Sequence, residues 1–118
     1  MVVRNYIESE LNEKSSHSGK GLARSIKLFN KEDFSSGLNF LYYMELDPGV
    51  SIGEHTHQDD EEEMYVILEG YGTMNINGEF REVKQGDVIL NRPGWSHGLE
   101  NTSSQILKIL AFEVSKDL

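Results

Sequence analysis

Short apolar or alternating runs follow one another along most of this chain, and turn signals separate them. The turn signals recur at roughly the 8–12-residue spacing of an all-β sandwich or barrel. Asn77-Gly78 predicts a type I′ hairpin turn, because that turn needs two positive φ angles. The turn signals lie at residues 35–37, 47–49, 69–70, 77–78, 85–86, 93–94 and 101–104.

Residues 38–46 are apolar on both faces of a predicted strand. One face carries Leu41 and Tyr43, and the other carries every second residue from Leu38 to Leu46. Such a strand is buried on two sides, against a barrel interior and against an outer cover. We expect a second protomer of a homodimer to supply this cover, and the chain's own N-terminal arm is the alternative. The last strand is expected at 106–114.

The N-terminal arm, residues 1–21, is less regular than the rest of the chain. Residues 6–14 are compatible with a short helix, whereas 15–21 are rich in serine and glycine and predict a loop.

Length and composition predict one domain over residues 1–118. The chain is 37% hydrophobic and 26% charged, which is ordinary for a globular protein. No apolar run approaches the ~20 residues of a membrane helix, and the start lacks a secretory apolar stretch. We therefore expect a cytoplasmic protein with no membrane partner. The chain has no cysteine, which excludes disulfides and thiolate metal ligands.

The formal net charge is −9, and the basic residues are dispersed along the chain. Nucleic acids and anionic membranes both select for a basic face. The charge therefore predicts that neither is a partner.

Histidines carry the candidate chemistry. His55 and His57 are separated by one residue, so on a strand both rings lie on one face, roughly 6–7 Å apart. At that separation two rings can converge on one ion with metal–nitrogen bonds of about 2.0–2.2 Å. A carboxylate from the acidic run 59–63 and a distant third histidine, His97, would complete a metal site.

Two glycine-led segments of the chain resemble the two motifs of small single-domain cupins. The resemblance implies a jelly-roll (double-stranded β-helix) barrel, with its core at 38–114. Two departures are visible: five residues separate His57 from Glu63 instead of three or four, and Arg92 stands where the second motif has a proline. The matching residues are Gly49, His55, His57, Glu63 and Gly70 in the first segment and Gly86, Gly94, His97 and Asn101 in the second.

The same resemblance implies a ligand set of His55, His57, Glu63 and His97, which we call the His/Glu group. The longer gap leaves Glu61 and Glu62 as alternative carboxylates, and Glu63 is preferred because six residues separate it from the motif glycine Gly70. Imidazole and carboxylate ligands suit one divalent transition metal: Mn, Fe, Co, Ni, Cu or Zn. Asn101 is interpreted as a strand-end residue and not as a ligand.

The resemblance implies a metal-dependent enzyme acting on a small oxygen-rich metabolite, such as a carboxylate, keto acid or sugar. Dioxygenase, decarboxylase, isomerase and lyase reactions are all represented among cupins. The first alternative is a module that binds or senses a small ligand through the metal without catalysis. The second is an ion that only clasps the two sheets together.

No acid–base partner for catalysis stands out from the sequence. Tyr42 and Tyr65 are candidate donors to an anionic substrate, although core packing is the competing interpretation. Arg24 could clamp a carboxylate. His17 could reach over the barrel mouth. Simple exposure is the competing interpretation for the last two.

Overall fold

The structure, a computed structural model, describes residues 1–116 and contains ten strands and one short 3-10 helix in that range. The elements are β1 (Asn12–Lys14), β2 (Ala23–Asn30), η1 (Lys31–Asp33), β3 (Leu38–Leu46), β4 (Ser51–Thr56), β5 (Glu61–Glu69), β6 (Tyr71–Ile76), β7 (Glu79–Lys84), β8 (Val88–Asn91), β9 (Ser96–Glu100) and β10 (Leu107–Ser115).

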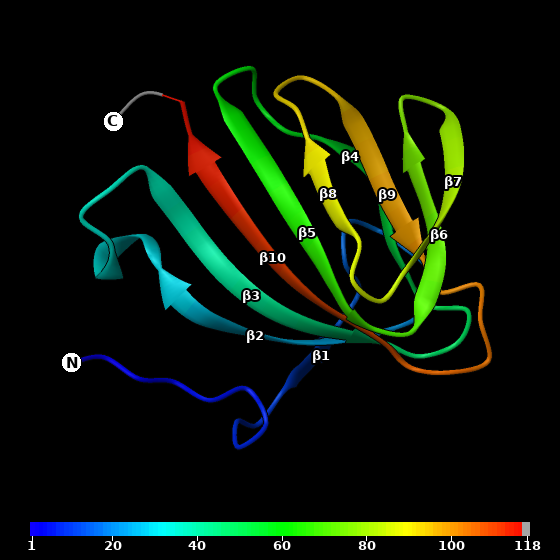
Figure 1. Ribbon diagram of the computed structural model, residues 1–118, viewed down its shortest axis with the longest axis horizontal. Helices are drawn as coiled ribbons and strands as arrows, with labels where there is room; N and C mark the ends of the chain where they lie inside the picture. The colour runs from blue at the N-terminus through cyan, green and yellow to red at the C-terminus, as the bar shows by residue number, and fades with distance from the viewer. Residues whose placement is uncertain (117–118) are drawn as a thin grey trace.

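The strands form two antiparallel sheets that face each other (Figure 1). The larger sheet has the order β1-β2-β3-β10-β5-β8, and the smaller has the order β4-β9-β6-β7. Strands distant in sequence, such as β3 and β10, therefore lie side by side. This is the arrangement of a jelly-roll barrel, and the predicted all-β fold is confirmed.

Local turn chemistry explains where several strands end. Asn77 and Gly78 both have positive φ angles, 50° and 82°, and they join β6 to β7 as the predicted type I′ hairpin. The last strand begins and ends one residue later than predicted.

Among the described residues no helix is long and apolar enough to cross a membrane.

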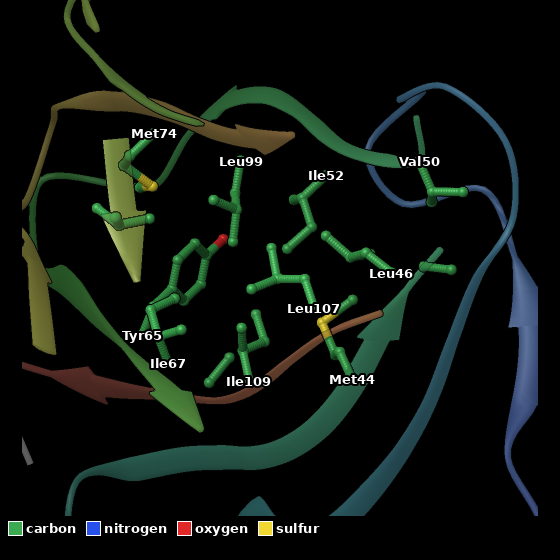
Figure 2. Packing of buried hydrophobic residues seen from close by; sticks show 13 residues of the cluster. Met44, Leu46, Val50, Ile52, Tyr65, Ile67, Met74, Leu99, Leu107 and Ile109 are labelled. Atoms are coloured by element: carbon green, nitrogen blue, oxygen red, sulfur yellow. The ribbon is translucent and has the colours of Figure 1, made fainter. Parts of the chain in front are cut away.

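The apolar core lies between the two sheets (Figure 2). Alternate residues of β5 and β10 are buried, as the period-two geometry of a strand requires. Tyr65 joins this core to the imidazole of His97, with the two ring centroids 5.5 Å apart. The most prominent core side chains are Met44, Leu46, Val50, Ile52, Tyr65, Ile67, Met74, Leu99, Leu107 and Ile109.

The helix expected at residues 6–14 is wrong. Residues 6–9 form a bent segment, and residues 12–14 form β1, which pairs with β2. The side-chain oxygen of Asn5 accepts hydrogen bonds from the backbone amides of Ile7 and Glu8, at 2.8 and 3.1 Å. A local side-chain bond of this kind competes with helix formation. Pairing with β2 then fixes an extended conformation.

The N-terminal arm covers part of the outer face of β3. Tyr6 stacks on Tyr43 with ring centroids 4.0 Å apart, and Tyr43 is only 2% exposed. Arg4 anchors the arm by donating to the Leu28 carbonyl and to Asp33. The N-terminal arm therefore covers part of this face within a single chain, which is the alternative to a second protomer. The homodimer stays a prediction.

Replacing Tyr6 with alanine should lower the free energy of unfolding by about 1–2 kcal/mol, because it removes an aromatic stack and exposes Tyr43. Urea unfolding measures the change. Ile7→Ala is the matched control, since Ile7 is 81% exposed, and it should change the free energy of unfolding by less than about 0.5 kcal/mol. Equal effects of the two substitutions would contradict the packing role of Tyr6.

Candidate metal centre

The structure brings the four side chains of the His/Glu group together from three segments of the two facing sheets. His55 lies on β4 directly opposite His97 on β9, His57 follows the end of β4, and Glu63 lies on β5. Glu63 Oε1 is 3.0 Å from His57 Nε2 and 2.8 Å from His97 Nε2. One ligand atom from each of the four lies within 4.8 Å of the others. Such a group could hold a metal ion.

Contacts of the Nδ1 atoms determine the orientation of the His55 and His57 rings. His55 Nδ1 donates to the Gly53 carbonyl at 2.7 Å, and His57 Nδ1 lies 3.7 Å from Glu113 Oε1. Both rings therefore direct Nε2 inward, where the Nε2 atoms of His55 and His57 are 3.2 Å apart. Partners of this kind on the second nitrogen are the usual way in which proteins orient metal-binding histidines. The donor set and its orientation fit a divalent transition metal.

The electrostatics favour an anionic Glu63 beside a neutral His97. Burial alone would raise the pKa of the Glu63 carboxyl, but hydrogen bonds from the surrounding imidazoles outweigh burial and hold that pKa below its usual range. Burial lowers the pKa of His97. The hydrogen bond to Glu63 raises the pKa of His57. An ionised Glu63 and a neutral His97 are protonation states that metal binding needs, whereas His57 would have to release any proton that it holds on Nε2.

The structure separates the three candidate carboxylates. Glu63 points between the sheets and is 5% exposed. Glu61 instead lies beside His57 and Glu113, on the other side of the His57 ring. Glu62 lines an outer hollow with Asp59 and Lys116. Only Glu63, among these three, shares a cluster with all three histidines.

A pocket of about 430 Å³ opens onto His57 and Glu63. Tyr42 and Tyr65 line it, as predicted for candidate lumen groups, and so does His17. Arg24 is engaged elsewhere, because it donates to Glu45 and Asp47 at 3.0 and 2.6 Å. Three of the four candidate catalytic residues therefore meet at the pocket.

A tight turn places His17 over the site. His17 and Ser18 both have positive φ angles, and the Gly53 amide donates to the Ser16 carbonyl at 3.0 Å. A Cβ atom at position 53 would lie 2.1 Å from the His17 carbonyl oxygen, so the close approach requires glycine there. The His17 ring then stacks on His55 with centroids 3.5 Å apart. His17 is thus a wall of the pocket and not a free loop residue.

Sequence reasoning missed Glu113, a buried acid that lines the pocket. Its signal was available: in the last strand the inward positions are Leu107, Ile109 and Ala111, and Glu113 is next on that face. Burial raises the pKa of the Glu113 carboxyl to about 7, and the neighbouring Glu61 carboxyl adds to the effect. At neutral pH Glu113 can therefore carry a proton.

Glu113→Gln should stabilise the metal-free protein more at pH 8 than at pH 5. The folded-state pKa of about 7 lies above the usual 4.5. The ionised carboxylate therefore costs stability above pH 7, and this cost vanishes below about pH 4.5. We expect the stability gain of the variant to grow by about 2 kcal/mol between pH 5 and pH 8. Urea unfolding at both pH values measures it.

Glu82→Gln is the matched control, because Glu82 is an exposed acid on β7. Its effect on the free energy of unfolding should be the same at both pH values. A pH-independent effect of Glu113→Gln would contradict the raised pKa of Glu113.

Known proteins are similar to this chain in sequence and in fold. The Cupin domain family matches residues 42–113. The oxalate-binding protein of Thermotoga maritima is 36% identical over 94% of this chain and 91% of its own length. The crystal structure of a predicted oxalate decarboxylase from Thermotoga maritima superposes with a TM-score of 0.91 at 36% identity, covering 98% of this chain and 99% of that one.

A more distant relative is the tetracenomycin polyketide synthase protein TcmJ of Streptomyces glaucescens. It is 29% identical over 85% of this chain, which corresponds to 64% of the relative. Together with the jelly-roll fold and the His/Glu group, the family match is decisive: the chain belongs to the cupin domain family.

Proposed function

We propose that this protein binds one divalent transition-metal ion on the His/Glu group and uses the ion to hold a small dicarboxylate of the oxalate class. The observation that carries the proposal is the convergence of three imidazoles and one carboxylate beside a pocket that two of them, His57 and Glu63, line. A closed structural clasp would need no pocket at that position. The pocket therefore favours ligand binding over the clasp.

The donor set selects the kind of metal and the kind of ligand. Three neutral imidazoles and one carboxylate suit Mn, Fe, Co, Ni, Cu or Zn. Such an ion, when bound, acts as a Lewis acid toward carboxylate oxygens. The four protein ligands leave positions of a six-coordinate shell open, and a dicarboxylate can fill them with two oxygens. A relative of 36% identity that is an oxalate-binding protein supports this ligand class.

The pocket walls are suited to an anion with a short organic body. Lys14 and Lys27 line the pocket, and the Lys27 ammonium lies 5.5 Å from the centre of the Tyr42 ring. These two lysines supply positive charge within a chain whose formal net charge is −9. The volume of about 430 Å³ also has room for keto acids larger than oxalate.

Turnover of the bound carboxylate is the second candidate function. Glu113 lines the pocket, and its pKa is raised to about 7. A group with this pKa is suited to proton transfer at neutral pH. Decarboxylation of oxalate consumes one proton as the C–C bond breaks to give carbon dioxide and formate. Glu113 is the residue that we expect to deliver that proton.

Calorimetric titration tests the proposed function. Protein stripped with EDTA should bind one Mn²⁺ per chain, and only the Mn²⁺-loaded protein should bind oxalate. Oxalate at 100 times its Kd should then stabilise the loaded protein by about 2.7 kcal/mol. Acetate, which has a single carboxylate, is the control and should bind far more weakly. Absence of stoichiometric Mn²⁺ binding, or oxalate binding without metal, would contradict the proposal.

Formate release from oxalate separates the two candidate functions. Binding with no formate supports a binding protein, whereas formate release that Glu113→Gln abolishes supports the decarboxylase.

A further inference from the structure

Asn91, the last residue of β8, is buried at an energetic cost. Its side chain is 1% exposed, and within residues 1–116 neither its amide nitrogen nor its amide oxygen has a hydrogen-bond partner. The large majority of buried side-chain polar atoms in folded proteins are hydrogen-bonded. An apolar side chain of similar size would be the cheaper choice at this position. The amide therefore calls for an explanation outside the packing of the metal-free protein.

The register of the larger sheet places Asn91 beside the candidate metal centre. Asn91 on β8 is directly opposite Glu63 on β5, and two residues along the same strands Ile89 is opposite Tyr65. Directly opposite residues of an antiparallel pair point to the same face, with Cβ atoms about 4.5–5.5 Å apart. Since Glu63 and Tyr65 both point between the sheets, Asn91 does so too. Its amide is thus the neighbour of the Glu63 carboxylate.

The hydrogen-bond donors available to the Glu63 carboxylate would differ with and without a bound ion. In the structure Oε1 accepts from His57 and His97. An ion on the His/Glu group would need a lone pair on each Nε2 atom, so neither nitrogen could keep the proton that it donates to Glu63, and both hydrogen bonds would be lost. The carboxylate then needs a new donor to hold its orientation. The Asn91 amide is a buried, unpartnered donor on the adjacent strand.

We propose that Asn91 is a positioning residue that donates an amide hydrogen to the Glu63 carboxylate when a divalent ion is bound. This inference rests on the proposed metal site. Asn91 acts through Glu63 and touches neither the ion nor the organic ligand. In the metal-free protein the same amide stays unpaired. Asn91 therefore lowers the stability of the metal-free protein and raises its affinity for the metal ion.

Asn91→Leu tests the proposal because it keeps the side chain's approximate volume and removes its polar atoms. Without metal, the variant should unfold at a temperature about 4 °C higher than the wild type, since a buried unpaired amide is gone. Its affinity for Co²⁺ should fall by roughly 10–100-fold, the usual effect of removing a partner of a metal ligand. The visible spectrum of bound Co²⁺, which reports the ligand arrangement, should also change.

Ile89→Leu is the matched control, because Ile89 lies on the same strand and face and packs against the core. It should leave Co²⁺ affinity unchanged. Asn91→Ala is the second variant and should show the same loss of affinity even if its cavity lowers the unfolding temperature. Wild-type Co²⁺ affinity in both Asn91 variants would overturn the role of Asn91 alone. Failure of the wild-type protein to bind Co²⁺ would overturn the proposed function as well.

Discussion

Replacing Asn101 with leucine is expected to lower the free energy of unfolding by about 3–5 kcal/mol. Asn101 is fully buried and makes four side-chain hydrogen bonds. Its amide nitrogen donates to the carbonyls of Leu46 and Gln105 at 2.8 and 2.6 Å, and its amide oxygen accepts from the backbone and hydroxyl of Ser103. Leucine would remove all four hydrogen bonds, at about 1–3 kcal/mol for each group that stays buried without another partner. The Gln105 carbonyl would still accept from the Ser103 hydroxyl at 3.1 Å.

Urea unfolding of the metal-free protein measures this loss. Gln105→Ala is the control, because its exposed side chain takes no part in the bonds that its own carbonyl accepts. The control should change the free energy of unfolding by less than about 0.5 kcal/mol. A loss below 1 kcal/mol for Asn101→Leu would show that water can replace the four bonds.

The backbone hydrogen bonds of Asn101 indicate a structural role for the end of the second motif. Its backbone amide donates to the Val50 carbonyl, and its carbonyl accepts from Gly49, both at 2.9 Å. Asn101 thus ties the loop before β10 to the turn before β4, the strand that carries His55. The interpretation of Asn101 as a strand-end residue agrees with this position, and its hydrogen bonds are structural. The motif therefore combines a candidate metal ligand, His97, with hydrogen bonds that hold the turn before β4.

Short-range rules accounted for much of the fold. Turn residues and period-two alternation predicted the all-β class, the hairpin at Asn77-Gly78 and the strand at 38–46, because each depends on a few neighbouring residues. The same rules failed at the N-terminal arm. There the conformation of residues 12–14 is set by pairing with β2, which a local pattern does not contain.

The candidate site divides in the same way. Spacing within the two motifs indicated which histidines and which acid to examine, and these lie together in the structure. Glu113 lies outside the motifs, and Asn91 lies within the second segment but is not one of its matching residues. Both reach Glu63 through strand pairing, because they are its two cross-strand neighbours, one on each side. The register of β10, β5 and β8 is what places these two residues beside Glu63, and local sequence patterns do not give that register.

Replacing His97 with alanine is expected to lower the affinity for Mn²⁺ by at least about 100-fold. His97 is fully buried, and its Nε2 lies 2.8 Å from Glu63 Oε1, so the alanine variant would lose a proposed ligand atom beside the carboxylate. Loss of a direct ligand should exceed the 10–100-fold effect of losing an outer partner. Calorimetric titration gives the affinity, and elemental analysis of the purified variant gives the metal content.

His17→Ala is the control that isolates coordination from simple proximity. The His17 ring stacks on His55, yet His17 is not a member of the His/Glu group. Its removal should change Mn²⁺ affinity by only a few-fold while altering oxalate binding, because His17 is a wall of the pocket and not one of the proposed ligands. Equal losses of Mn²⁺ affinity in His97→Ala and His17→Ala would contradict the assignment of His97, and not His17, as a ligand. Retention of stoichiometric Mn²⁺ at wild-type affinity by His97→Ala would remove His97 from the proposed ligands and leave only His55, His57 and Glu63.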